Sequence, residues 1–157
     1  MLLPEVAATA ATHRGVFLRR HALAGGYTDD EIRRLHSHQV WRRVRRGAYC
    51  EMAQWRAADD VERDRMRVHA ATMVLDEPAV VSHQSAAVVL GLTLWGAHLD
   101  LVHVTRTDLP APRIEGGVHH HEGALEAGDV VVADGLRVTS PARTAVDVAR
   151  ETVSRSG

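Results

Sequence analysis

The sequence predicts an α+β protein in two parts, a winged helix-turn-helix at residues 1–52 and a small mixed α/β domain at residues 53–157. Three observations support this division. Helical spacing broken by glycines runs through the first part, a basic segment with strand-like alternation ends it, and short apolar strands alternate with helices afterwards. A chain of 157 residues has room for two small domains, each with its own core.

Three short helices are expected in the first part. Apolar residues at helical spacing predict a first helix that ends near residue 13. A second helix over residues 17–24 is expected to end at Gly25. The pattern Thr28-x-x-Glu31 is a capping box, in which each side chain satisfies a backbone N–H of the other residue, and it opens the third helix.

The third helix separates its side chains into two faces. One face holds Ile32, Leu35, His36 and Gln39. The opposite face holds Arg33, Arg34, Ser37 and His38. The segment 40–49 then alternates loosely and turns at Arg46 and Gly47, as expected for the β-hairpin of a winged helix.

The second part is predicted to alternate between helices and strands. The expected helices cover residues 57–76 and 84–90 and a last segment opened by Ser140 and Pro141. The expected strands cover residues 80–81, 101–105 and 117–121, with a hairpin over 129–138 that turns at Asp134 and Gly135. In the last helix, Arg143 is expected to pair with Asp147 one turn later. That helix carries an apolar stripe of Ala142, Ala145, Val146, Ala149 and Val153.

Positive charge is concentrated in the first part. Between His13 and Cys50 there are nine arginines and three acidic residues, and the residues after Cys50 carry an acidic excess of the same size, so the net charge is only −1. A helix that enters the major groove needs donors that reach the bases and cations that bind the phosphates, so the basic first part indicates DNA binding.

All nineteen basic residues are arginine. The absence of lysine excludes Schiff-base, P-loop and lysine-dependent nuclease sites.

The arginines of the first part are assigned two roles. Arg33 and Arg34 are candidates for base contacts, because a guanidinium binds the edge of guanine through two hydrogen bonds. Backbone contacts are expected from Arg42, Arg43, Arg45 and Arg46 and from Arg14, Arg19 and Arg20. If about five to seven phosphates are contacted, log affinity should fall with log salt concentration at a slope of about −5 to −6. The alternative interpretation is a solvated basic face in an arginine-rich protein.

Neither a metal nor a cofactor is expected from the histidines. On a strand, His119 and His121 point to one face and His120 to the other, so the three cannot converge, and an exposed edge strand is predicted instead. The histidines His83, His98 and His103 are isolated in sequence and are taken as structural.

The remaining reactive residues also favour a non-enzymatic protein. Cys50 has no paired histidine or aspartate motif and is expected to be a buried or bystander thiol. The acidic residues within 59–64 alternate with arginines, as in a solvated helix face with ion pairs. A single cysteine, no apolar run long enough for a membrane span, and a start without a secretion signal favour a soluble, cytoplasmic protein.

Five blocks of the sequence carry a resemblance to a known family. They are GVFLRRHALAGGYTDDEIRRL, WRRVRRGAYC, VVSHQSAAVVLGL, VHVTR and DGLRVTSPARTAVDVAR. In order and spacing, these blocks resemble the AbiEi-type antitoxins of actinobacteria, which are the antitoxin half of type IV, abortive-infection toxin–antitoxin pairs. The resemblance extends over nearly the whole chain.

The resemblance implies a winged-helix domain followed by an α/β domain. It also implies a protein that binds repeats in its own promoter as a repressor and opposes a nucleotidyltransferase-like toxin. By position, Thr28, Arg33, Arg34 and Ser37 match the recognition helix of that family. Its wing is matched by Trp41, Arg42, Arg43, Arg45 and Arg46.

Two other functions stay open. Similar N-terminal regions precede a nuclease-like domain related to very-short-patch repair endonucleases, so the chain could be the DNA-targeting part of such a protein, without its catalytic domain. Alternatively, the arginines could meet an acidic protein surface in a pure interaction module. Palindromic half-sites commonly need dimers, so a homodimer is a further expectation for the DNA-binding case.

Overall fold

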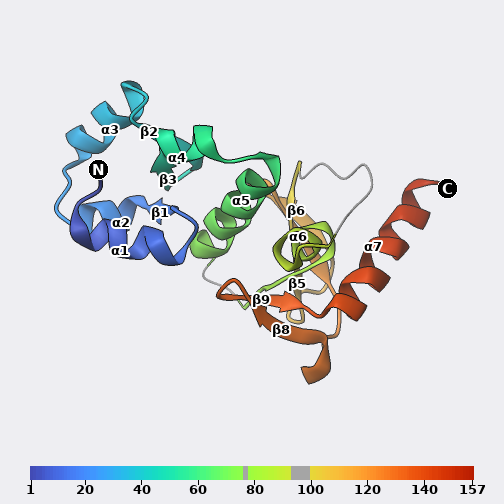
Figure 1. Cartoon of the computed structure of the whole chain (residues 1–157). Helices are drawn as coiled ribbons and strands as arrows, with labels where there is room; N and C mark the ends of the chain where they lie inside the picture. The colour runs from blue at the N-terminus through green and yellow to red at the C-terminus, as the bar shows by residue number, and fades with distance from the viewer. Residues whose placement is uncertain (76–77, 93–99) are drawn as a thin grey trace. The chain divides into compact units, whose positions relative to one another are not determined.

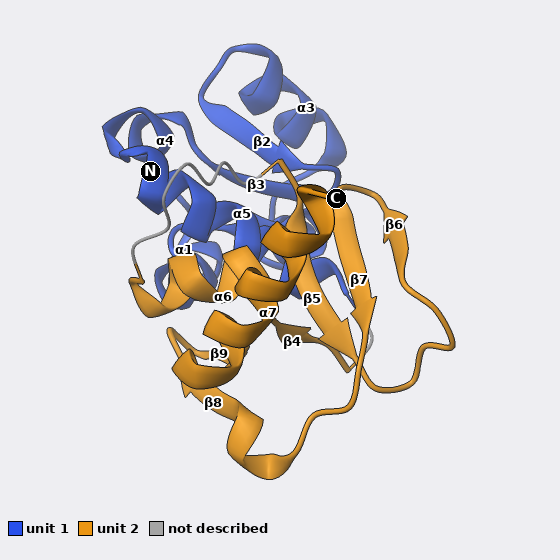
Figure 2. Cartoon of the chain, turned by 90° about the vertical axis from the view of Figure 1, so that its right-hand side faces the viewer, with its two compact units in different colours: residues 1–76 blue, residues 77–157 orange. Residues whose placement is uncertain are grey.

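A computed structural model describes residues 1–75, 78–92 and 100–157 of the chain. Helices and strands are both well represented, which confirms the α+β class. The chain divides into two compact units, residues 1–76 and residues 77–157 (Figure 2). Within the described ranges, every helix is too short or too polar to cross a lipid bilayer.

Unit 1 is built from five helices and a three-stranded antiparallel sheet with the strand order β1-β3-β2 (Figure 1). Its elements are α1 (Pro4–Thr12), β1 (Phe17–Leu18), α2 (Arg19–Ala24), α3 (Asp29–Ser37), β2 (Trp41–Arg45), β3 (Ala48–Glu51), α4 (Met52–Ala57) and α5 (Asp60–Val74). The predicted hairpin is present, and its turn at Arg46 and Gly47 uses a positive φ at the glycine, a conformation that glycine adopts without strain. Residues 17 and 18, predicted to start a helix, instead form β1.

The sheet of unit 1 has a core on each of its faces. On one face, Phe17 and Trp41 pack with residues of α1, α2 and α3. On the other face, Ala48 and Cys50 pack with Trp55 of α4 and with residues of α5. A second helical layer is therefore needed to cover the sheet.

Because the helices of the second layer belong to unit 1, the boundary between the two units lies later in the chain than predicted. Met66 and Ala70 of α5 are fully buried in the core that contains Cys50. The compact units consequently divide the chain at residues 76 and 77, not at the predicted 52 and 53. The predicted helix 57–76 is also interrupted, because Asp59 caps a new helix by accepting a hydrogen bond from the Glu62 amide at 2.8 Å.

Over residues 78–92 and 100–157, unit 2 is a six-stranded sheet with the order β6-β7-β5-β4-β9-β8 and two helices. Its elements are β4 (Val80–Val81), α6 (His83–Leu90), β5 (Val102–Arg106), β6 (Arg113–Glu115), β7 (Val118–Glu122), the 3₁₀ turn η1 (Ala127–Asp129), β8 (Val130–Ala133), β9 (Leu136–Thr139) and α7 (Pro141–Arg155). The pairs β5–β7 and β4–β9 are parallel, and the other neighbours are antiparallel. The predicted hairpin turns at Asp134 and Gly135, both with positive φ.

One prediction for unit 2 is wrong, and one predicted feature is exposed. The strand that carries His119 is not an exposed edge, because β6 pairs with one side of β7 and β5 with the other. The apolar stripe of α7 does not face a core: Val146 is 46% exposed and Val153 is 73% exposed, whereas Thr144 and Asp147 are buried. This helix packs with its polar side, which places charged groups over the sheet.

Candidate nucleic-acid interface

The capping box at the start of α3 forms as predicted. The Glu31 amide donates to Thr28 Oγ1 at 3.2 Å, and the Thr28 amide donates to the Glu31 carboxylate at 2.7 Å. The hydrogen bond from the Thr28 backbone, followed by that from its hydroxyl, lowers the pKa of Glu31. Thr28 therefore fixes the start of α3, and its hydroxyl is used within the protein.

The two predicted faces of α3 are also present. Ile32 is buried in the core of unit 1, while Arg33, Arg34, Ser37 and His38 are exposed. The guanidinium of Arg33 pairs with Asp30 at 2.7 Å, but both side chains are about three-quarters exposed, so the pair contributes little stability and can separate easily. Arg34 has no ion-pair partner among the described residues.

Trp41 has to be removed from the predicted interface. Its side chain is 2% exposed and packs edge-on against Phe17 and Tyr27. A side chain enclosed in the core of unit 1 cannot contact DNA, so Trp41 positions β2 and does not bind a ligand.

The arginines of β2 leave the sheet on opposite faces. Successive side chains of a strand alternate, and Arg42 lies directly opposite Cys50 in the sheet. The Arg42 guanidinium accordingly lies 5.2 Å from the ring centre of Trp55, on the side of α4. Arg43 shares a face with Trp41, which is the face that α3 covers. A small cavity of about 240 Å³ between α3 and β2 is lined by His36, Gln39, Trp41, Arg42, Arg43 and Met52.

Arg45 and Arg14 are half-buried. Arg45 lies opposite Ala48, past an irregularity in the pairing, and burial lowers the pKa of its guanidinium. Arg14 pairs with Glu62 of α5 at 3.0 Å. Neither arginine can contact a phosphate without giving up an interaction inside the protein.

The turn between β2 and β3 lies beside the start of α2. The Arg19 amide donates to the carbonyl of Gly47 at 2.9 Å, which brings Arg46 close to Arg19 and Arg20. The side chain of Arg19 also pairs with Asp29 at the start of α3. The turn, the start of α2 and the start of α3 are thus linked.

Of the nine arginines predicted for the interface, four are exposed and have neither an ion pair nor an aromatic contact among the described residues, and we call them the unpaired arginine set. They are Arg20 on α2, Arg34 on α3, Arg43 on β2 and Arg46 in the hairpin turn. The acidic residues at the start of α3 are largely compensated, because Asp29 pairs with Arg19 and Asp30 with Arg33. Among the arginines predicted for the interface, this set is therefore the most readily available to an anion.

The structure also brings together residues that sequence reasoning kept apart. His103, taken as an isolated structural residue, lies beside His119 and His121 of the neighbouring strand. His119 and His121 do point to one face, as predicted. Only the parallel pairing of β5 with β7 reveals the third imidazole, and no sequence signal gave that register. His98 lies outside the described residues.

Comparison of the chain with protein-family models and with curated proteins found no match.

Proposed function

We propose that unit 1 is a winged helix-turn-helix that binds duplex DNA. The order of helices and strands supports this, since α2 and α3 form the two helices of the motif and β2–β3 forms the adjoining hairpin. The observation that carries the proposal is the unpaired arginine set, Arg20, Arg34, Arg43 and Arg46, on these same elements. Exposed guanidinium groups on a helix and hairpin are suited to bases and phosphates.

In this proposal α3 enters the major groove. Arg34 reads a base edge, because it is exposed near the middle of α3 and has no internal partner among the described residues. Arg33 joins it once released from Asp30, and Ser37 and His38 lie on the same exposed face. Arg20, Arg43 and Arg46 bind the flanking phosphates.

On the resemblance of the five sequence blocks, we propose that the chain is a non-enzymatic antitoxin. It represses its own promoter by binding repeats there and opposes a nucleotidyltransferase-like toxin, with unit 2 providing the contacts to the toxin or to a second copy. A cytoplasmic location follows from that role.

Gel-shift titration of the duplex upstream of its own gene, beside a shuffled duplex of equal composition, tests DNA binding. The double variant Arg34→Ala/Arg43→Ala should weaken binding to the upstream duplex at least about tenfold, the effect of one lost base contact. The control is Arg56→Ala, which removes an exposed arginine of α4 on the opposite side of the sheet. Equal affinity of the double variant and the control variant would refute the proposed interface.

A further inference from the structure

Three histidines of unit 2 lie on one face of the sheet. β5 and β7 run parallel with His103 opposite His119 and Thr105 opposite His121, so strand alternation places all four side chains on the same side. Figure 2 shows α6 and α7 in front of these strands. His83, at the start of α6, stacks on His121 with ring centres 3.7 Å apart, which places the helices on the histidine face.

The three imidazoles are close enough to share one ion. A nitrogen atom of each of His103, His119 and His121 lies within 4.8 Å of the other two. Nδ1 of His103 and Nε2 of His121 are 2.9 Å apart and share one hydrogen bond. Ligand nitrogens about 2.0–2.1 Å from a tetrahedral Zn²⁺ stand about 3.4 Å from one another, so small side-chain rotations convert this arrangement into a coordination shell.

Two of the three imidazoles, His103 and His121, are in the form that binds metals. Burial is the largest cause and neighbouring histidines add to it, so that the pKa of His103 is lowered to about 4, although Glu151 opposes the shift, and that of His121 is lowered to about 2. Both rings are therefore neutral at physiological pH. A neutral imidazole offers a nitrogen lone pair, and a metal ion replaces only a hydrogen bond between two uncharged rings.

A cavity of about 680 Å³ opens onto this cluster. Its lining includes His119 and His121 from the sheet and Arg143, Asp147 and Glu151 from α7. Thus an ion held by the imidazoles would have a coordination position facing the cavity, as in zinc sites that keep a place for water or substrate.

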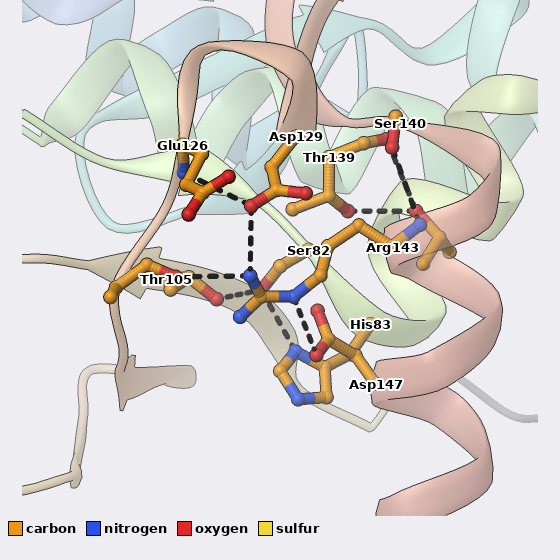
Figure 3. Close-up of polar contacts among 11 residues, drawn as sticks. Ser82, His83, Thr105, Glu126, Asp129, Thr139, Ser140, Arg143 and Asp147 are labelled. Atoms are coloured by element: carbon orange, nitrogen blue, oxygen red, sulfur yellow. Dashed lines mark hydrogen bonds and ion pairs between the residues drawn. The ribbon is translucent and has the colours of Figure 1, made fainter.

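Asp147 provides an independent observation at the same cavity. Its side chain is 6% exposed, and its Oδ1 accepts a hydrogen bond from Arg143 Nε at 3.0 Å. Its buried Oδ2 accepts none from the described residues. Figure 3 shows Asp147 and His83 pointing toward one another, with Arg143 already bound to Asp129 at 3.2 Å. A buried carboxylate oxygen without a donor is costly, and a metal ion or its bound water would satisfy it.

We propose that His103, His119 and His121 bind one Zn²⁺ ion, with the fourth coordination position open to the cavity. Three nitrogen ligands suit Zn²⁺ among the common divalent ions, while Mg²⁺ and Ca²⁺ prefer oxygen. Asp147 lines the same cavity as His119 and His121, so we assign its Oδ2 as the acceptor for a metal-bound water. His83 positions His121 by stacking on it, and its Nδ1 is fixed by a 2.9 Å hydrogen bond with Ser82 Oγ.

Isothermal titration of the full chain with ZnCl₂, after chelator treatment and without a polyhistidine tag, tests the site. The expected result is one ion per chain, with a visible absorption spectrum typical of tetrahedral Co²⁺ when cobalt replaces zinc. His119→Ala should weaken zinc binding by at least about 100-fold, because removal of an outer-shell partner alone already costs up to that much. The control is His38→Ala, which removes an exposed histidine of unit 1.

A measurement of thermal unfolding distinguishes loss of zinc binding from a failure of the variant to fold. Zinc should raise the melting temperature of the wild-type chain and of His38→Ala, but not that of His119→Ala or of the second variant His121→Gln. A wild-type chain that binds no zinc would overturn the proposal. So would equal zinc binding by His119→Ala and His38→Ala, because that result means binding by scattered surface histidines.

Discussion

The indole of Trp41 packs edge-on against the ring of Phe17, with ring centres 4.7 Å apart. Both side chains are buried between the sheet of unit 1 and its N-terminal helices. Aromatic pairs in this geometry add to the stabilisation that comes from burial alone. Trp41 thereby anchors β2 and sets which arginines of that strand face α3.

Trp41→Ala should lower the free energy of unfolding of unit 1 by about 3–5 kcal/mol, because it leaves a large cavity in the core. Denaturant unfolding followed by circular dichroism measures this loss. Arg43→Ala, two residues along the strand and exposed, should change the stability by less than about 0.5 kcal/mol. Equal stability of Trp41→Ala and the wild-type chain would contradict a buried role for the indole.

The salt dependence of DNA binding should be weaker than the sequence alone predicts. Arg14 pairs with Glu62, Arg42 lies over the ring of Trp55, and Arg45 is half-buried. Within the unpaired arginine set, Arg20, Arg43 and Arg46 are assigned to phosphates. Three neutralised phosphates correspond to a slope of about −3 in a plot of log affinity against log salt concentration. Arg46→Ala should make this slope shallower by about 1, whereas Arg56→Ala should leave it unchanged. A slope of about −6 would mean that the engaged arginines rearrange on DNA.

Removal of an acidic residue from α3 should strengthen DNA binding. Asp30 pairs with Arg33 and adds a negative charge beside the proposed groove contact. Asp30→Ala frees the guanidinium for a base edge and removes the repulsion, so the affinity should rise. Fluorescence anisotropy with a labelled duplex measures the affinity.

Asp60→Ala is the matched control for that variant, since Asp60 forms a comparable exposed pair with Arg63 on α5. Its affinity for the duplex should equal that of the wild-type chain. Equal affinity of Asp30→Ala and Asp60→Ala would place α3 outside the interface.

The features that sequence reasoning predicted well depend on residues close together in the chain. The capping box of Thr28 and Glu31 and the pair between Arg143 and Asp147 each connect positions three or four residues apart. The turn at Asp134 is equally local, because a two-residue hairpin turn determines its own backbone geometry. Such features need no knowledge of the tertiary fold.

The features that were missed depend on partners distant in sequence. Strand β1 exists only because Phe17 pairs with Tyr49. The histidine cluster needs the register between β5 and β7, which places His103 opposite His119. Trp41 lies in the segment predicted to form the wing, and only its packing against Phe17 shows that it is buried. The pattern and spacing of residues in the sequence do not determine which distant strands or side chains pair.

Cys50 should react slowly with alkylating reagents in the folded chain. Burial raises the pKa of its thiol to about 12, so almost no thiolate exists at neutral pH. Iodoacetamide labelling followed by mass spectrometry should be slow at pH 7 to 8, and fast once denaturant unfolds the chain. Fast labelling of the folded chain would contradict the burial of this thiol.

The same shift makes unit 1 less stable in alkali. In the unfolded chain the Cys50 thiol has its ordinary pKa of about 8.5 and loses its proton near that pH. In the folded chain the thiol keeps its proton until about pH 12. The stabilisation is therefore complete below the unfolded pKa and is lost progressively as the pH rises between the two values. Cys50→Ala should remove this part of the alkaline destabilisation.

Substitution of Arg143 should destabilise unit 2. Its guanidinium holds Asp129 at 3.2 Å, Asp147 at 3.0 Å and the carbonyl of Ala124 at 2.9 Å, which connects α7 to the loop before β8 (Figure 3). Arg143→Ala leaves the buried carboxylate of Asp147 without this donor, and the unfolding free energy of unit 2 should fall by about 2–3 kcal/mol.

Arg137→Ala is the control for this variant, because Arg137 is an exposed arginine of β9 in the same unit. Its stability should lie within about 0.5 kcal/mol of the wild type. In the double variant Arg143→Ala/Asp147→Ala the buried charge is gone as well, so part of the lost stability should return. If the double variant lost more stability than the two single variants together, the unpaired carboxylate of Asp147 would not be the cause of the loss in Arg143→Ala.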